Sequence, residues 1–120
     1  MKPRHDTELR ASLRLSAMSA VLGYDERLLY FVFHHKERRL REPPEELLEE
    51  ARALSHGERV LIQCAIDLWN GRGGARLSEI MDTLDDDRFL DLIRGLLQFR
   101  EIENERRLEC LSYPEVPPHA

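Results

Sequence analysis

The chain has few cysteines and no long apolar segment. No apolar stretch approaches the roughly 20 residues that a transmembrane helix needs, and none resembles the apolar region of a signal peptide. Cys64 and Cys110 could form one disulfide, but without an export signal we expect two reduced thiols. These absences predict a cytoplasmic protein that has no contact with a membrane.

The sequence also lacks the residue patterns of metal, phosphate-binding and catalytic sites. His34 and His35 are adjacent, so on a helix their rings would point about 100° apart and could not easily share an ion. The glycine-rich segment 70–74 lacks the Gly-Lys-Ser/Thr ending of a P-loop. Asp82 and the aspartates at 85–87 lack the alternating ligands of a calcium loop. We therefore expect no metal, no cofactor and no enzymatic activity.

Charge is distributed unevenly along a chain whose net charge is −5. Residues 1–41 hold nine Lys or Arg and five Asp or Glu (+4), whereas residues 42–120 hold nine Arg and eighteen acids (−9). The basic run ends where an acidic helix is expected to begin, an arrangement that helix dipoles favour. The alternative is a contact surface for an acidic partner or nucleic acid, although the net charge disfavours nucleic acid. Its candidate residues are Lys36, Arg38, Arg39 and Arg41.

The centre of the chain predicts a buried helix. Ser55 and Glu58 have the spacing of a capping box, and the residues that follow are apolar apart from one narrow polar line. That line consists of Arg59, Gln63, Asp67 and Asn70. Asp67 is expected to face solvent; if neighbours cover it instead, its carboxylate needs a hydrogen-bonded or charged partner.

Apolar spacing and capping residues predict five further helices around this one. They are expected at 7–22 with Thr7 as N-cap, at 25–41, at 44–53, from Ser78 as N-cap with Ile80, Met81 and Leu84 inside, and from the aspartates at 85–87 through Arg100. A short strand or hairpin is an option at 102–112, and 114–120 reads as an unstructured tail. The fold class is therefore mainly α: one compact multi-helix domain over residues 1–113, with an optional small C-terminal β-hairpin.

The second half resembles a known family of domains. The run from Leu77 to Leu84, the apolar residues from Phe89 to Leu97, and Ile102 are similar to the helix-turn-helix part of winged-helix domains, a likeness that covers residues 56–112. The resemblance implies that the second helix of the pair is available for DNA. That helix opens with three aspartates, which repel phosphate, and its expected outward positions include Asp87, Asp91, Arg94 and Gln98. We therefore expect a protein-binding or dimerising version of the fold.

A contiguous apolar patch gives the first candidate contact surface. Its residues Leu28, Tyr30, Phe31 and Phe33 lie in a helix that could also be read as a strand. The leading interpretation is a non-enzymatic interaction or regulatory module that acts through apolar helix faces, as a homodimer or with another protein. The alternative is a nucleic-acid-binding transcriptional regulator that uses the basic 34–41 surface or the helix-turn-helix-like half.

Overall fold

The protein is mainly α-helical, as predicted. The computed structural model describes the backbone of residues 2–112 and the side chains of residues 9–105. Its elements are α1 (Lys2–Val21), α2 (Glu26–Val32), α3 (Pro44–Glu50), a 3-10 turn (Ala51–Ala53), α4 (His56–Asn70), α5 (Leu77–Thr83) and α6 (Asp86–Ser112). None of the described helices is long and apolar enough to cross a membrane.

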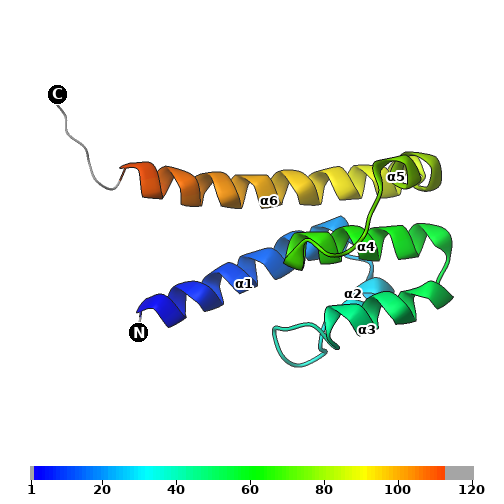
Figure 1. Ribbon diagram of the computed structural model, residues 1–120, viewed down its shortest axis with the longest axis horizontal. Helices are drawn as coiled ribbons and strands as arrows, with labels where there is room; N and C mark the ends of the chain where they lie inside the picture. Colours follow the sequence, from blue (N-terminus) through cyan, green and yellow to red (C-terminus); the bar gives the residue numbers. More distant parts are fainter. Residues whose placement is uncertain (1, 113–120) are drawn as a thin grey trace.

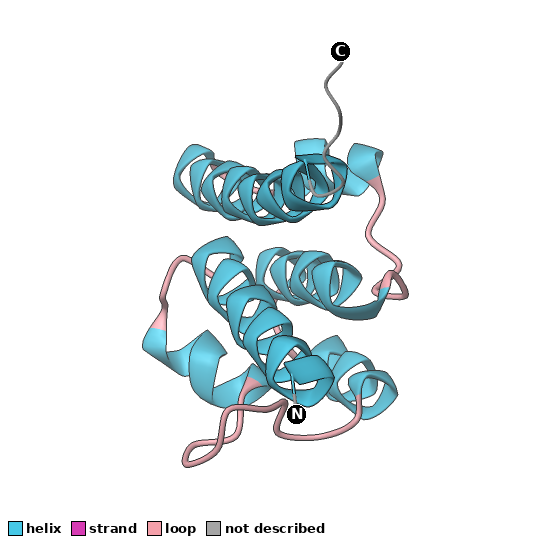
Figure 2. Cartoon of the chain, turned by 90° about the vertical axis from the view of Figure 1, so that its left-hand side faces the viewer, coloured by secondary structure: helices cyan, strands magenta, loops and turns pink. Residues whose placement is uncertain are grey.

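The helices stack in layers around α4 (Figure 1). In Figures 1 and 2, α6 lies on one side of α1 and α4, while α2 and α3 lie on the other side. Because both neighbouring layers cover α4, residues Val60, Leu61, Ile62, Ala65 and Ile66 are at most 1% exposed. Burying side chains of this size is the main source of folding free energy. The prediction of a buried central helix is confirmed.

Local signals set both ends of α4. Ser55 Oγ accepts from the backbone N–H of Glu58 (3.3 Å), and the Glu58 carboxylate accepts from the backbone N–H of Ser55 (3.2 Å), which completes the predicted capping box. At the other end, Gly71 takes a left-handed conformation (φ 76°), and its N–H donates to the carbonyl of Asp67. A glycine accepts this conformation without the steric cost of a Cβ atom.

The predicted C-terminal hairpin is wrong. Helix α6 continues through residues 102–112 and ends at Ser112. The segment has no glycine or proline to end a helix, and it is rich in Glu, Arg and Leu, which are good helix formers. The predicted tail at 114–120 lies outside the described residues.

The helix predicted at 25–41 is also wrong in its second half. Helix α2 ends at Val32, and residues 33–40 form a loop closed by an isolated antiparallel bridge between Phe33 and Leu40. Backbone hydrogen bonds cross the loop from His34 N to the Arg39 carbonyl (2.8 Å) and from Arg41 N to the Val32 carbonyl (2.8 Å). The basic run therefore lies in this loop, and no helix dipole explains it.

Two predicted caps differ from the structure. Helix α1 begins before Thr7, and α5 begins at Leu77, with Arg76 at the N-cap position and Ser78 inside the helix. The interior of α5 is partly as predicted: Ile80 is buried and Leu84 is half-buried, but Met81 is 65% exposed. Only the side of α5 that carries Ile80 and Leu84 faces the core, over one helical turn, and Met81 lies on the exposed side.

Candidate functional site

The four residues of the predicted apolar patch do not share a surface. Leu28 is 2% exposed and belongs to the core, whereas Tyr30 is 62% exposed. Phe31 is half-buried beneath the guanidinium of Arg41, which lies 5.2 Å from its ring centroid. Phe33 packs at the closed end of the 33–40 loop. On a helix of seven residues, consecutive side chains point in different directions, so contiguity in sequence does not make a contact surface.

The four predicted basic residues lie in or beside the 33–40 loop, but half of their charge is neutralised within the protein. Arg39 Nε donates to Glu37 (2.7 Å), which lowers the pKa of the Glu37 carboxyl, and Arg41 Nη2 donates to Glu50 (2.6 Å). No ion pair joins Lys36 or Arg38 to another described side chain. These two cations are therefore the charge that the loop presents to solvent.

The prediction that Asp67 faces solvent is wrong, and the alternative of a covered carboxylate holds. Asp67 is half-buried, and its two carboxylate oxygens accept from the backbone N–H groups of Gly73 (2.6 Å) and Ala75 (3.1 Å). The carboxylate thus fixes the loop between α4 and α5 against α4. Both carboxylate oxygens therefore hold the backbone of this loop in place.

Glu58 carries a buried charge whose partner could not be identified from sequence spacing. The residue is 5% exposed, and its carboxylate forms a two-pronged ion pair with the guanidinium of Arg27 on α2, with 3.2 Å between Nη2 and Oε1. The hydrogen bond from Arg27 is the largest cause that lowers the pKa of Glu58; burial opposes it. The pair therefore joins α2 to the start of α4.

We expect the stability contributed by the Glu58 charge to disappear in acid. A carboxyl whose pKa is lower in the folded state stabilises the fold above its unfolded pKa, near 4.3, and this contribution is lost as pH falls through the folded value. Glu58→Gln should therefore cost about 1 kcal/mol at pH 7 and less below pH 4. Urea unfolding of both proteins between pH 7 and pH 3 measures the difference.

A matched control is Glu49→Gln, because Glu49 pairs with Arg52 at the surface, where both side chains are at least 70% exposed. An exposed pair of this kind contributes little, so the control should unfold like the parent protein at both pH values. A destabilisation by Glu58→Gln that stays constant down to pH 3 would contradict the assignment of the charge to this pair.

Helix α6 presents an apolar outer face, although its expected outward positions are polar. Leu90 is 49% exposed and Leu97 is 61% exposed, whereas Leu92 is 2% exposed. Gly95 marks the inner face, since a Cβ built on it would lie 2.6 Å from the backbone N of Val21 in α1. At about 100° per residue, Leu90 and Leu97 lie about 140° and about 160° around the helix from Gly95, in the same direction. We call Leu90, Ile93 and Leu97 the outer stripe of α6.

Two predicted outward positions of α6 in fact face inward partners. Gln98 Nε2 donates to Ser16 Oγ on α1 (2.9 Å), and Asp91 lies next to Gly23 while it accepts from Arg94 (3.2 Å). Helix α6 is therefore rotated from the orientation predicted by its leucines. Gln98 and Asp91 thus contact α1 and the turn after it, whereas Asp87 and Arg94 are exposed as predicted.

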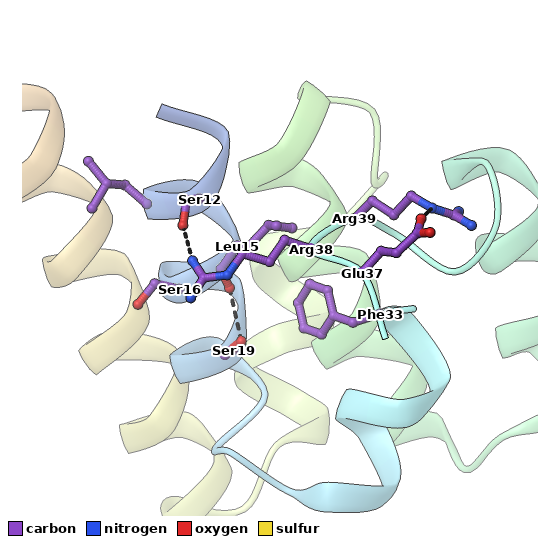
Figure 3. A pocket seen from close by; sticks show the side chains of 9 residues that line it. Ser12, Leu15, Ser16, Ser19, Phe33, Glu37, Arg38 and Arg39 are labelled. Atoms are coloured by element: carbon purple, nitrogen blue, oxygen red, sulfur yellow. Dashed lines mark hydrogen bonds and ion pairs between the residues drawn. The ribbon is translucent and has the colours of Figure 1, made fainter. Parts of the chain in front are cut away.

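Helix α1 and the 33–40 loop line a pocket of about 480 Å³ that is open to solvent. Three serines one and two turns apart form one wall, and Arg38 crosses from the loop to donate to the hydroxyl of Ser12 (Figure 3). The lining residues are Ser12, Leu13, Leu15, Ser16, Ser19, Phe33, Glu37, Arg38 and Arg39. Sequence reasoning missed this pocket, because its two walls are about 20 residues apart in the chain.

Cys64 is a free cysteine buried in α4. Burial, together with the nearby Asp67 charge, raises the pKa of its thiol to about 12, so the sulfur stays protonated at neutral pH. A buried, protonated thiol is a poor nucleophile and metal ligand. The side chain of Cys110 lies outside the described residues.

Comparison of the chain with protein families, with curated proteins and with solved structures finds no match. The likeness of residues 56–112 to winged-helix domains therefore stays a prediction.

Proposed function

We propose that this protein is a non-enzymatic interaction module that self-associates through the outer stripe of α6. The observation that carries the proposal is the exposure of Leu90 and Leu97, seven residues apart on the side of α6 that faces away from α1. Leucines at this spacing stay on one side of a helix for two turns. Water-exposed leucines in such a stripe gain free energy when a second apolar helix covers them.

A second copy of the chain fits the stripe because the stripe is self-complementary. If two α6 helices cross antiparallel near Ile93, Leu90 of each copy meets Leu97 of the other. The same two-fold arrangement brings Asp87, one turn before Leu90, beside Arg100, one turn after Leu97, and both residues are exposed. An isologous interface of this kind uses one surface patch twice. The contact covers only about 20 Å of helix, so we expect micromolar affinity.

The same stripe argues against the alternative of a DNA-reading α6. A recognition helix presents polar and basic side chains to base edges and phosphates. The outward side of α6 instead presents leucines, and its first turn carries Asp86 and Asp87. Titration with duplex and single-stranded oligonucleotides at low salt tests this alternative, and tight salt-sensitive binding would favour it over self-association.

We expect Leu97→Glu to weaken self-association at least tenfold. The substitution places a carboxylate in each half of the two-fold contact, opposite Leu90 of the other copy. Dimerisation would then remove the hydration of this carboxylate, or bring it near the Asp87 carboxylate of that copy. The fold itself should be unaffected, because the side chain is already 61% exposed. Sedimentation velocity between 1 and 200 µM measures the dimer fraction of both proteins.

Leu77→Glu is the matched control. Leu77 lies on α5 and is 79% exposed, so its replacement removes more exposed apolar surface than Leu97→Glu without touching the outer stripe. We expect it to dimerise like the parent protein. Equal loss in both variants would show that self-association is not specific to the outer stripe, and a parent protein that is monomeric over the whole concentration range would end the proposal.

A further inference from the structure

The pocket between α1 and the 33–40 loop combines a positive charge, which pairs with no carboxylate among the described side chains, with hydroxyl groups and an apolar floor. Its volume of about 480 Å³ lies in the range of small-molecule sites. Figure 3 shows Ser12, Ser16 and Ser19 along α1, with Arg38 reaching toward them and the ring of Phe33 facing the same space. The pocket is separate from the outer stripe of α6.

The charge of this pocket comes from Arg38. Of the three ionised residues in the lining, Glu37 and Arg39 neutralise each other in an ion pair of 2.7 Å, and this pair points away from the serines in Figure 3. Among the described side chains, Arg38 donates to a neutral hydroxyl, that of Ser12, and pairs with no carboxylate. A guanidinium carries five N–H donors, so several remain for a ligand. The described lining therefore has a net charge of +1 in a chain whose net charge is −5.

The serines differ in what they can offer. Ser12 and Ser16 accept hydrogen bonds, from Arg38 and from Gln98 (2.9 Å), so each keeps its own O–H as a donor. Ser19 instead donates its proton to the carbonyl of Leu15 (2.9 Å). The pocket thus presents two hydroxyl donors on consecutive turns of α1, on the same wall that Arg38 reaches.

We propose that this pocket binds a small organic anion, with a carboxylate or phosphate head and an apolar body. The head takes the guanidinium of Arg38 and the hydroxyls of Ser12 and Ser16, since planar guanidinium forks pair well with both anion types. The apolar body lies against Leu13, Leu15 and Phe33. An inorganic anion can bind only to the guanidinium and hydroxyl groups of the pocket, and a neutral aromatic alcohol can pack only against its apolar floor.

The proposal is tested by titrating the full ¹⁵N-labelled chain with benzoate and with phenyl phosphate at low salt. We expect saturable, millimolar shifts of the amide signals near Ser12, Ser16 and Arg38. Inorganic phosphate and benzyl alcohol should each bind at least fivefold more weakly than the better of the two probes. Comparison of benzoate with phenyl phosphate identifies which head group the pocket prefers.

Arg38→Gln should weaken binding of the better probe at least fivefold. Arg38 is exposed, so the variant is expected to fold, and its amide spectrum verifies this. Arg52→Gln is the control, because Arg52 is an exposed arginine outside the pocket. Absence of saturable shifts, undiminished binding by Arg38→Gln, or equal loss in both variants would overturn the proposal.

Discussion

We expect Gly73→Ala to destabilise the fold by about 3 kcal/mol, the upper end of what overpacking costs. Gly73 lies in the loop after α4 and is buried against that helix. A Cβ atom on it would lie 2.8 Å from the backbone N of Asp67 and closer still to the carbonyl oxygen of Gln63. Both are backbone atoms of α4, so they cannot move without disturbing the hydrogen bonds of the central helix. Urea unfolding measures the loss.

The neighbouring glycine provides the control for this prediction. Gly74 has a left-handed conformation (φ 77°), but a Cβ on it would meet nothing nearer than the side-chain nitrogen of Gln63 at 4.0 Å. Gly74→Ala should therefore cost only the backbone strain, about 1 kcal/mol. If the two variants lose equal stability, the close approach of Gly73 to α4 has no special energetic weight.

The same loop explains why Asp67 could not be placed from sequence. Its position on the polar line of α4 was evident, but the line says nothing about what covers it. The covering groups are the backbone N–H groups of Gly73 and Ala75. Every residue except proline has a backbone N–H group, so residue types do not show which of these groups will approach a carboxylate. The folded structure is needed to identify them. A glycine six residues after the aspartate was the one available signal.

The sequence predicts well where a boundary depends on neighbouring residues. The capping box at Ser55 acts within one helical turn, and the predicted start of α4 is confirmed. The 33–40 loop is different. There the imidazole of His34 accepts from the backbone N–H groups of Lys36 (3.1 Å) and Glu37 (3.0 Å), and these bonds replace helical ones. Helical charge and apolar patterns continue through this segment, so the pattern alone predicted a helix.

The candidate pocket and the Arg27–Glu58 pair depend on tertiary arrangement. The serines at 12, 16 and 19 lie on one side of α1 at helical spacing, but nothing in the sequence says that Arg38 lies opposite them. Likewise, Glu58 was identified as a capping residue, and its second partner comes from α2. Sequence periodicity assigns side chains to a face, while the partner of that face is set by packing.

The orientation of α6 was predicted only in part, because the helix contacts α1 most closely at Gly95, a residue without a side chain. Periodicity locates the face with the most apolar side chains, and on α6 that face includes Leu97. The helix instead packs closely at Gly95, which has no side chain for the pattern to register. This close approach turns Leu90 and Leu97 outward, so one glycine accounts for both the error and the proposed interface.

We therefore expect Gly95→Ala to destabilise the fold by about 2 kcal/mol through overpacking. A Cβ on Gly95 would lie 2.6 Å from the backbone N and 2.9 Å from the Cα of Val21, so α6 would have to move away from α1. The sign of the change is informative, because Gly→Ala inside an exposed helix stabilises it by about 1 kcal/mol. Urea unfolding at pH 7 gives the change in unfolding free energy.

Gly57→Ala is the matched control for a glycine inside a helix. A Cβ on Gly57 in α4 would approach only the Nη1 atom of Arg88, at 2.8 Å, and this flexible side-chain end can move at little cost. We expect stabilisation by about 0.5 kcal/mol, because alanine has less chain entropy to lose than glycine. Opposite signs for Gly57→Ala and Gly95→Ala are the expected result. Stabilisation by both would mean that α1 and α6 do not approach closely at Gly95, and the outer stripe of α6 would lose its physical basis.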